Sequence, residues 1–304
     1  MTGEAPRILV FGQSGQVATA LLARAIAQGA RVLVLGRGDL DLSKAPATGG
    51  LEHVSEKTAK RIEAFQPTFA INASAYTAVD RAETERDQAF ALNEGGAAYA
   101  ARLATELGVD FAHLSTDYVY AGTKSEPYVE TDPVDPQSIY GASKRAGEQA
   151  VLAAHNNAFI FRTAWVYSPF GNNFVKTMLR FGAEREGLSV VDDQLGSPTS
   201  AHDIAEALVT LAAQDRAGRG GVYHLAGTGE ASWCDFARAI FAISGSLGGP
   251  QVPVEAIPTS AYPTPAKRPA NSRLDCSKLQ SELGLYVPKW EDSLERVIKA
   301  FLVA

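Results

Sequence analysis

A glycine-rich turn at the start of the chain constrains the fold more than any other feature of the sequence. Residues 7–11 (RILVF) form a compact apolar run that is typical of a buried parallel strand. Gly12, Gly15 and Ala18 follow in the spacing G-x-x-G-x-x-A, and a helical stretch runs on to Gly29. Glycine lets the backbone turn sharply and lets a pyrophosphate approach the free N–H groups of a helix N-terminus. The pattern therefore favours a dinucleotide site over a tight loop without a ligand.

Strands and helices alternate through the first half of the chain. After the first strand, apolar strands are expected at 31–36, 68–72, 109–116 and 158–167, and helices at 55–66, about 86–107 and around residue 140. Five such alternations predict an α/β fold with a doubly wound parallel sheet of the Rossmann type. We assign this nucleotide-binding domain to residues 1–167.

The pattern loosens beyond residue 167, where shorter elements predict a smaller α/β substrate lobe. A helix is expected from about residue 174, strands at 188–193 and 221–227, and helices at 203–213 and 233–244, the last capped by Ser232. The proline-rich stretch 248–269 is expected to be irregular, and helices around 277–283 and 291–302 close the chain. We assign residues 168–304 mainly to this lobe, with segments around 188–214 returning to the first domain.

Tyr140 and Lys144 stand four residues apart in YGASK, on one face of an expected helix. A phenol has an ordinary pKa of about 10, and a nearby ammonium favours its ionised form, which makes the phenol a better proton donor or acceptor. Such a pair suits carbonyl/alcohol redox chemistry. Alone it is weak evidence, because an exposed Tyr and Lys at this spacing are common.

Other candidate residues follow the expected strands, at the edge where open α/β sheets bind ligands. Thr116 and Asp117 end the fourth strand, although a simple turn or cap is an equal alternative there. Arg37 follows the second strand, where an acidic residue would hold the ribose hydroxyls of NAD and a cation suits a 2′-phosphate. We therefore expect NADPH, with NADH left open because Asp39 and Asp41 lie close by.

With these features together, the chain resembles the extended short-chain dehydrogenase/reductases and, within them, the dTDP-4-dehydrorhamnose reductases. The resemblance runs nearly end to end and is carried by FGQSGQV, INASAYTAVDRAE, STDYVY, PYVETDPVDPQSIYGASKRAGE, RTAWVYSPFGNNFVKTMLR, DDQLGSPTS and RPANSRLD. It implies hydride transfer from NADPH to the C4 ketone of dTDP-4-dehydro-L-rhamnose, a nucleotide-sugar precursor of cell-surface polysaccharide. Another dTDP-4-keto-sugar remains open as the substrate.

The resemblance also implies roles for individual residues. Tyr140 would donate the proton, Lys144 would bind the nicotinamide ribose, and Thr116 would hydrogen-bond the sugar oxygen. Residues expected to meet the rest of the cofactor are Gly12, Gly15, Gln16, Val17, Asp41, Leu42, Ala75, Tyr76 and Thr77. Residues expected to meet the sugar or the dTDP end are Asp117, Trp165, Asn173, Arg268 and Arg273.

One departure from the family and two rival functions bear on this interpretation. Some members of the family join two subunits through magnesium held by a glutamate on the first helix, and the matching residue here is Ala20, which puts that dimer in doubt while leaving a homodimer open. Sugar-nucleotide dehydratases carry Thr-Asp-Glu where this chain has Thr116, Asp117 and Tyr118, which disfavours dehydration. A non-catalytic regulator like the methionine adenosyltransferase β-subunit is the other alternative.

Composition narrows the class of protein. The net charge of −6, without a dense Lys/Arg cluster, disfavours nucleic acid or an anionic membrane as a partner. Cys234 and Cys276 could form at most one bridge, no apolar run is long enough to span a membrane, and the scattered histidines suggest no metal site. With no signal peptide visible in the sequence, we expect a cytoplasmic protein.

Overall fold

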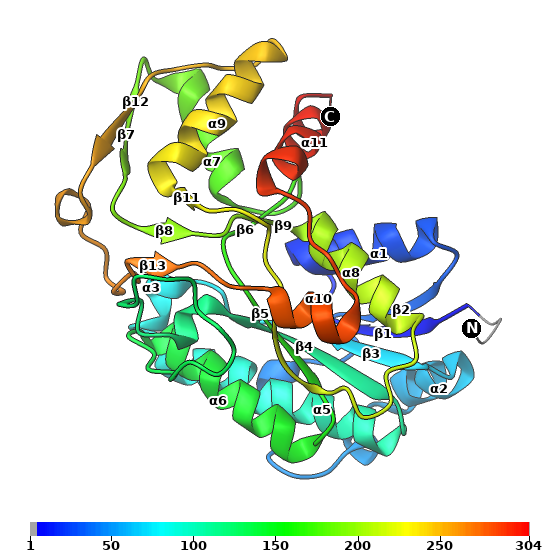
Figure 1. Cartoon of the computed structure of the whole chain (residues 1–304). Coiled ribbons are helices and arrows are strands. Elements are labelled where there is room, and N and C mark those ends of the chain that lie inside the picture. Colours follow the sequence, from blue (N-terminus) through cyan, green and yellow to red (C-terminus); the bar gives the residue numbers. More distant parts are fainter. Residues whose placement is uncertain (1–4, 304) are drawn as a thin grey trace.

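A six-stranded parallel sheet forms the centre of the molecule in the computed structural model, which describes residues 5–303 (Figure 1). Its strand order is β10-β5-β4-β3-β1-β2, and every neighbouring pair is parallel. The strands are β1 (Arg7–Phe11), β2 (Arg31–Leu35), β3 (Phe69–Asn72), β4 (Asp110–Thr116), β5 (Phe159–Thr163) and β10 (Gly221–His224). The predicted doubly wound α/β fold is confirmed.

Helices cover both faces of this sheet, as the apolar strand sequences require. On one face, α1 (Gln16–Ala27), α8 (Ala201–Ala212) and α10 (Ser277–Leu283) share a core with Ile8, Val10 and Ile71. On the other, α2 (Glu56–Phe65), α5 (Ala97–Glu106) and α6 (Ile139–Ala154) share a core with Leu9, Phe11 and Ile160. Alternate residues of each strand thus enter opposite cores, and the ligand-binding edge stays at the strand ends.

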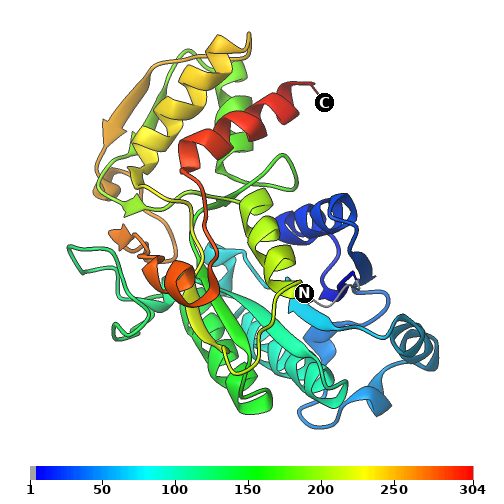
Figure 2. The same ribbon diagram turned by 45° about the vertical axis from the view of Figure 1, so that its right-hand side comes forward.

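A second lobe lies beyond the carboxyl ends of the strands, at the top of Figures 1 and 2. Its core is formed by α7 (Phe174–Glu184), α9 (Trp233–Ser246), α11 (Trp290–Val303) and β7 (Leu188–Val191), which pairs with β12 (Val254–Ile257). Short strands join the two lobes: β6 (Val166–Tyr167) with β9 (Thr199–Ser200), and β8 (Leu195–Gly196) with β11 (Ala231–Ser232) and β13 (Asn271–Ser272).

Three segments differ from their sequence-based predictions. The strand expected at 158–167 is two strands, because the backbone of Trp165 adopts a positive φ of 47° and redirects the chain. The stretch 248–269, expected to be irregular, contains β12. Residues 221–224, expected in the second lobe, form the sixth strand of the central sheet, while residues 188–191 pair with β12 instead of returning to it.

The long helix predicted at 86–107 is interrupted by a π-helical segment. It consists of α4 (Arg86–Phe90), a π-helical turn at Ala91–Gly96, and α5. Gly96 lies so close to a short 3₁₀ turn (Leu42–Lys44) that an added Cβ would stand 2.7 Å from the carbonyl oxygen of Leu42. Single π turns of this kind are frequent at functional sites, and this one presents Asn93 to the residues after β3.

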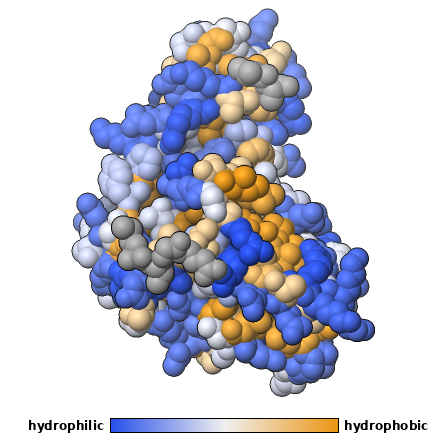
Figure 3. Space-filling view, turned by 90° about the vertical axis from the view of Figure 1, so that its right-hand side faces the viewer, coloured by the Kyte–Doolittle hydropathy of each residue, from blue (hydrophilic) through white to orange (hydrophobic). Residues whose placement is uncertain are grey.

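The face that carries α1 is mixed in character (Figure 3). Apolar patches interrupt a mainly polar surface there, and α1 supplies two of the exposed large hydrophobic side chains, Leu22 and Ile26. Among residues 5–303 the structure contains no helix with the length and hydropathy of a membrane span.

Candidate active site

Thr116, Asp117 and Tyr140 come together where β4 ends and α6 begins. Ser138 caps α6 by accepting a hydrogen bond from the Gly141 amide at 3.1 Å, and this fixes the first turn of the helix that carries Tyr140. The Thr116 hydroxyl donates to Oδ1 of Asp117 at 3.0 Å and lies close enough to the phenol of Tyr140 to lower its pKa. The three predicted residues therefore form one buried polar cluster.

The phenol of Tyr140 is held in its neutral, proton-bearing form. Burial raises its pKa above the ordinary value of 10, and the charges of Asp117 and Tyr118 act in the same direction, whereas the nearby Thr116 hydroxyl lowers it. The Tyr118 ring packs edge-on against the Tyr140 ring, with centroids 5.5 Å apart. A protonated phenol at the carboxyl edge of the sheet can serve as a proton donor at neutral pH.

Lys144 is fully buried one turn after Tyr140. Its Nζ donates to the carbonyl oxygen of Leu114 at 2.6 Å and lies 3.3 Å from Nε2 of His113. Burial lowers the pKa of Lys144 to about 8, and the carboxylate of Glu148 opposes that shift. The sequence suggested that this ammonium would promote ionisation of Tyr140; instead it faces β4, and burial dominates the pKa of the phenol.

Asp117 is the other strongly shifted group of the cluster. Burial raises the pKa of its carboxyl from 3.8 to about 6, and the nearby hydroxyls of Ser272 and Thr116 partly offset that rise. Ser272 belongs to β13, in the segment that the sequence marked as RPANSRLD. Asp117 thus lies close to a segment from the last quarter of the chain, and its Oδ2 is buried without a hydrogen-bond partner.

The turn after β1 fits a dinucleotide. Gly12 has a φ of +111°, and an added Cβ would lie 3.0 to 3.2 Å from Ser74 and Ala73, so only glycine keeps this close approach of two strand ends. Gly15 precedes α1, which has no side-chain cap and no acidic residue in its first turn. Free N–H groups at such a terminus attract a pyrophosphate.

Gln16 joins this turn to the start of the second lobe. Its Oε1 accepts hydrogen bonds from Ser168 at 2.7 Å and from Asn173 at 2.9 Å. The side chain of Asn173 also caps α7 through the Lys176 amide, so the amide group predicted to face the dTDP end lies beside the glycine turn. The neighbouring residue Val17 is buried in the core beneath α1.

The residues predicted to hold the rest of the cofactor also lie along the strand ends. Arg37 is exposed, 4.0 Å from a carboxylate oxygen of Asp41, which itself caps the turn that contains buried Leu42. After β3, the half-buried residues Ala75 and Tyr76 and the exposed residue Thr77 follow, and Asn93 holds Tyr76 through both its backbone N–H and its backbone C=O.

Trp165 has a strained backbone and a tightly defined indole. A positive φ is rare for a bulky residue and marks a position that its surroundings hold in place. The indole stacks on Trp233 with ring centroids 3.5 Å apart and planes 8° apart. It follows Thr163, which pairs with Thr116 across the sheet, so Trp165 begins the wall of the site beside the Tyr140 cluster.

The two arginines predicted at the dTDP end have different surroundings. Arg268 pairs with Asp80 at 2.7 Å and donates to the Tyr118 hydroxyl at 3.3 Å, which brings it to the edge of the Tyr140 cluster. Arg273 pairs with Glu230 at 2.8 Å and holds the Asn271 side chain. The structure therefore brings Arg268 to the cluster and engages Arg273 with Glu230 and Asn271.

Sequence reasoning missed three features of the site. Asn93 was hidden in an alanine-rich helix, Trp233 was considered only as a helix residue, and Glu148 and Arg162 form an ion pair behind the site at 2.7 Å. One signal was available for Glu148, because it follows Lys144 by four residues and so lies on the same face of α6.

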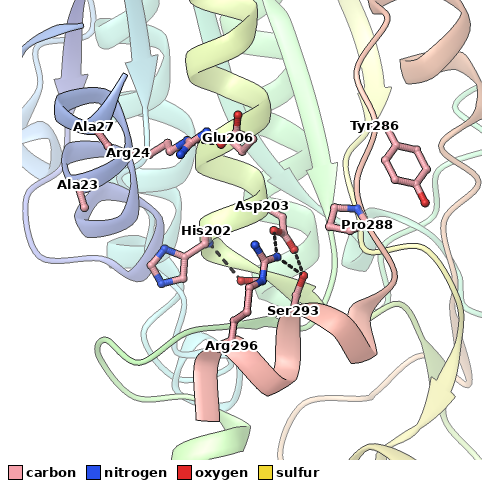
Figure 4. Close-up of a pocket in the computed structure, with 11 residues that line it drawn as sticks. Ala23, Arg24, Ala27, His202, Asp203, Glu206, Tyr286, Pro288, Ser293 and Arg296 are labelled. Carbon is pink, nitrogen blue, oxygen red and sulfur yellow. Dashed lines mark hydrogen bonds and ion pairs between the residues drawn. The ribbon is translucent and has the colours of Figure 1, made fainter. Parts of the chain in front are cut away.

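A cavity of about 510 Å³ lies elsewhere, between α1, α8 and α11 (Figure 4). None of the predicted site residues lines it. Its charged groups pair with one another: Arg24 with Glu206, and Arg296 with Asp203 at 2.8 Å. Such a neutralised surface holds no free charge for the reaction, so the strand-end cluster remains the candidate active site.

The comparisons with known proteins identify the family of the chain. The profile of the family described as "RmlD substrate binding domain" matches residues 6–303. The chain belongs to this family. It is 44% identical to the dTDP-4-dehydrorhamnose reductase of Sinorhizobium fredii, with 98% of each chain covered, and 38% identical to that of Escherichia coli, with 96% of each covered. The family resemblance indicated by the sequence motifs is confirmed.

Solved structures of the family have the same architecture. The dTDP-4-dehydrorhamnose reductase of Bacillus anthracis in complex with NADP superposes with a TM-score of 0.85 at 34% identity, covering 98% of this chain and all of that one. The orthologue from Clostridium acetobutylicum gives a TM-score of 0.86, also at 34% identity, covering 97% of this chain and 99% of that one. The match extends through both lobes.

The position that the resemblance matched to a magnesium-holding glutamate in some family members is Ala20 in α1. Ala20 is fully buried in the core between α1 and α8. Within residues 5–303 no group of three or more His, Cys, Asp or Glu side chains is arranged to hold a metal ion.

Proposed function

We propose that this protein reduces the C4 ketone of dTDP-4-dehydro-L-rhamnose to give dTDP-L-rhamnose, with NADPH as the cofactor. The observation that carries the proposal is the buried Thr116–Tyr140 cluster at the carboxyl edge of a Rossmann sheet, opposite a glycine turn with an uncapped helix N-terminus. Relatives across nearly the whole chain are named for this reaction, and one solved relative is in complex with NADP.

The cofactor would lie across the strand ends. Gly12, Gly15, Gln16 and Val17 would meet its pyrophosphate, Arg37 its 2′-phosphate, and Asp41 and Leu42 its adenine. Ala75, Tyr76 and Thr77 would line its middle, and Lys144 would turn from Leu114 to the nicotinamide ribose. When bound, NADPH supplies the hydride.

The chain's own residues supply the proton and the geometry. As negative charge develops on the C4 oxygen of the sugar, Tyr140 donates its proton to that oxygen, and Thr116 stabilises the oxygen with a hydrogen bond. Burial keeps Tyr140 protonated until a base stronger than phenolate forms in the site. Asp117 and Trp165 would contact the sugar, and Asn173, Arg268 and Arg273 would act toward the dTDP end.

The site lacks the carboxylate that a dehydratase needs, because the position after Asp117 is occupied by Tyr118. Burial raises the pKa of Tyr118 to about 12, so this residue is not a base at neutral pH. The regulator alternative predicts NADPH binding without turnover. A homodimer without the magnesium link and a cytoplasmic location remain predictions.

Mixing the protein with dTDP-4-dehydro-L-rhamnose and NADPH tests the proposal. We expect the absorbance of reduced nicotinamide to fall only when the keto-sugar is present, with the Tyr140→Phe variant as the matched control. Tight NADPH binding without oxidation would support the regulator instead.

A further inference from the structure

A chain of buried polar residues lies behind the Tyr140 cluster and has no assigned role. At its centre Glu148, on α6, accepts hydrogen bonds from Arg162 on β5: Nε to Oε1 at 2.8 Å and a terminal nitrogen to Oε2 at 2.7 Å. Both side chains are buried, Glu148 completely and Arg162 with 2% of its surface exposed. A bidentate pair of this kind fixes orientation as well as distance.

The pair fastens the catalytic helix to β5, the strand that lies beside β4 and its Thr116. Glu148 is one turn beyond Lys144 and two turns beyond Tyr140, so all three face the sheet from one side of α6. Oε1 of Glu148 also accepts a hydrogen bond from Ser115 at 2.6 Å, and Ser115 immediately precedes Thr116. One carboxylate therefore sets the position of α6 relative to the ends of both β4 and β5.

The network of buried polar side chains continues from Arg162 toward the second lobe. A second terminal nitrogen of Arg162 donates to the Tyr120 hydroxyl at 2.7 Å, and that hydroxyl lies 2.6 Å from Nε2 of His224 on β10. Nδ1 of His224 is 2.9 Å from the carbonyl oxygen of Asp275, at the end of the segment that also contains Ser272. The catalytic helix and this substrate-lobe segment thus share one hydrogen-bonded network.

We propose that Glu148 and Arg162 are positioning residues for the reduction, which hold Tyr140, Lys144 and Thr116 in their reactive arrangement. The inference rests on the proposed function. Stability alone is a weak reason for the pair, because two apolar side chains of similar volume often replace a buried ion pair without loss of stability. An apolar pair could not supply the directional hydrogen bonds that hold α6 to β4 and β5.

The charge of Glu148 makes the positioning role measurable in the pH dependence of the rate. Lys144 faces His113 from β4 and Glu148 from its own helix, and the Glu148 carboxylate holds the pKa of Lys144 up against burial, at about 8. Loss of that carboxylate lowers the pKa of Lys144 further. If Lys144 acts as a cation, the basic limb of the pH–rate profile then moves to lower pH.

The test compares two variants with the wild type. Glu148→Gln keeps the volume but turns amide hydrogens toward Arg162, whereas Glu148→Met combined with Arg162→Met removes both charges. We expect the single variant to melt at a lower temperature and to lose about 10- to 100-fold in kcat, the range for a displacement near 1 Å. The double variant recovers melting temperature but not kcat.

Asp110→Asn is the matched control, because Asp110 pairs with Arg216 at 2.9 Å at the opposite end of the same strand β4. It should lower the melting temperature and leave kcat unchanged. A double variant with wild-type kcat, or a Glu148→Gln profile with an unshifted basic limb, overturns the positioning role. An inactive wild type instead refutes the proposed function, whereas losses confined to the Glu148 and Arg162 variants support this inference.

Discussion

Gly196→Ala tests whether the indole of Trp165 forms the sugar wall of the site. Gly196 lies in β8 directly beneath that indole, and an added Cβ would stand 2.5 Å from Cζ2 and 2.7 Å from Nε1. Carbon atoms in ordinary contact are about 3.5–4.0 Å apart, so the ring must move by about 1 Å. The backbone of Trp165 is already strained, and the other face of its indole is stacked on Trp233.

A displacement of about 1 Å in a substrate-positioning group can cost about 100-fold in rate. We therefore expect kcat/KM for the keto-sugar to fall by about 10- to 100-fold, with a loss of about 1–3 kcal/mol in stability from overpacking. The affinity for NADPH should not change, because the glycine turn lies on a different strand.

The assay is the initial rate of NADPH oxidation at varied keto-sugar concentration, together with NADPH binding by fluorescence. Gly187→Ala is the matched control, because a Cβ there meets its nearest neighbour, Pro253, at an ordinary 3.5 Å. Unchanged kinetics in Gly196→Ala would show that Trp165 does not shape the sugar site.

Three further predictions follow from single groups. Tyr140→Phe should lower turnover by at least about 100-fold with NADPH affinity nearly intact, because a positioned acid contributes about 10²–10⁴-fold; wild-type turnover would exclude Tyr140 as the acid. The pKa of Asp117 is about 6 in the folded protein and 3.8 in the unfolded chain, so the folded state binds this proton more tightly. The free energy of unfolding should therefore fall by up to about 3 kcal/mol as pH rises from about 4 to about 6. Denaturant unfolding of Asp117→Asn should lack that decline, and parallel curves for both proteins would contradict the shift. Arg37→Ala should lower kcat/KM for NADPH by about tenfold and leave NADH nearly unaffected, since a contact between charged groups contributes about 1.5 kcal/mol or more; equal losses with both cofactors would exclude contact with a 2′-phosphate.

The sequence was most informative where local pattern decides structure. The first apolar strand, the turn at Gly12 and the cap at Ser232 depend on neighbouring residues, and the structure has each of them where it was expected. The approach of Thr116 to Tyr140 was expected from the family resemblance, which gave both residues a role at the same sugar oxygen.

Features that depend on tertiary contacts could not be read in the same way. Trp165 breaks the expected strand because Gly196 and Trp233, from distant parts of the chain, define the space for its indole. The orientation of Lys144 toward Leu114 depends on burial between α6 and β4, which no spacing of residues along the chain reveals. The ion pair of Glu148 with Arg162 likewise appears only when the helix is placed on the sheet.

Transfer of deuterium tests the central claim most directly. The wild-type protein would be mixed with dTDP-4-dehydro-L-rhamnose and NADPH that carries deuterium at the transferred position of the nicotinamide, and the product examined by NMR and mass spectrometry. The account predicts one deuterium per product molecule, bound to C4 of the sugar. NADPH consumption without deuterium at C4, or deuterium at another carbon, would contradict it.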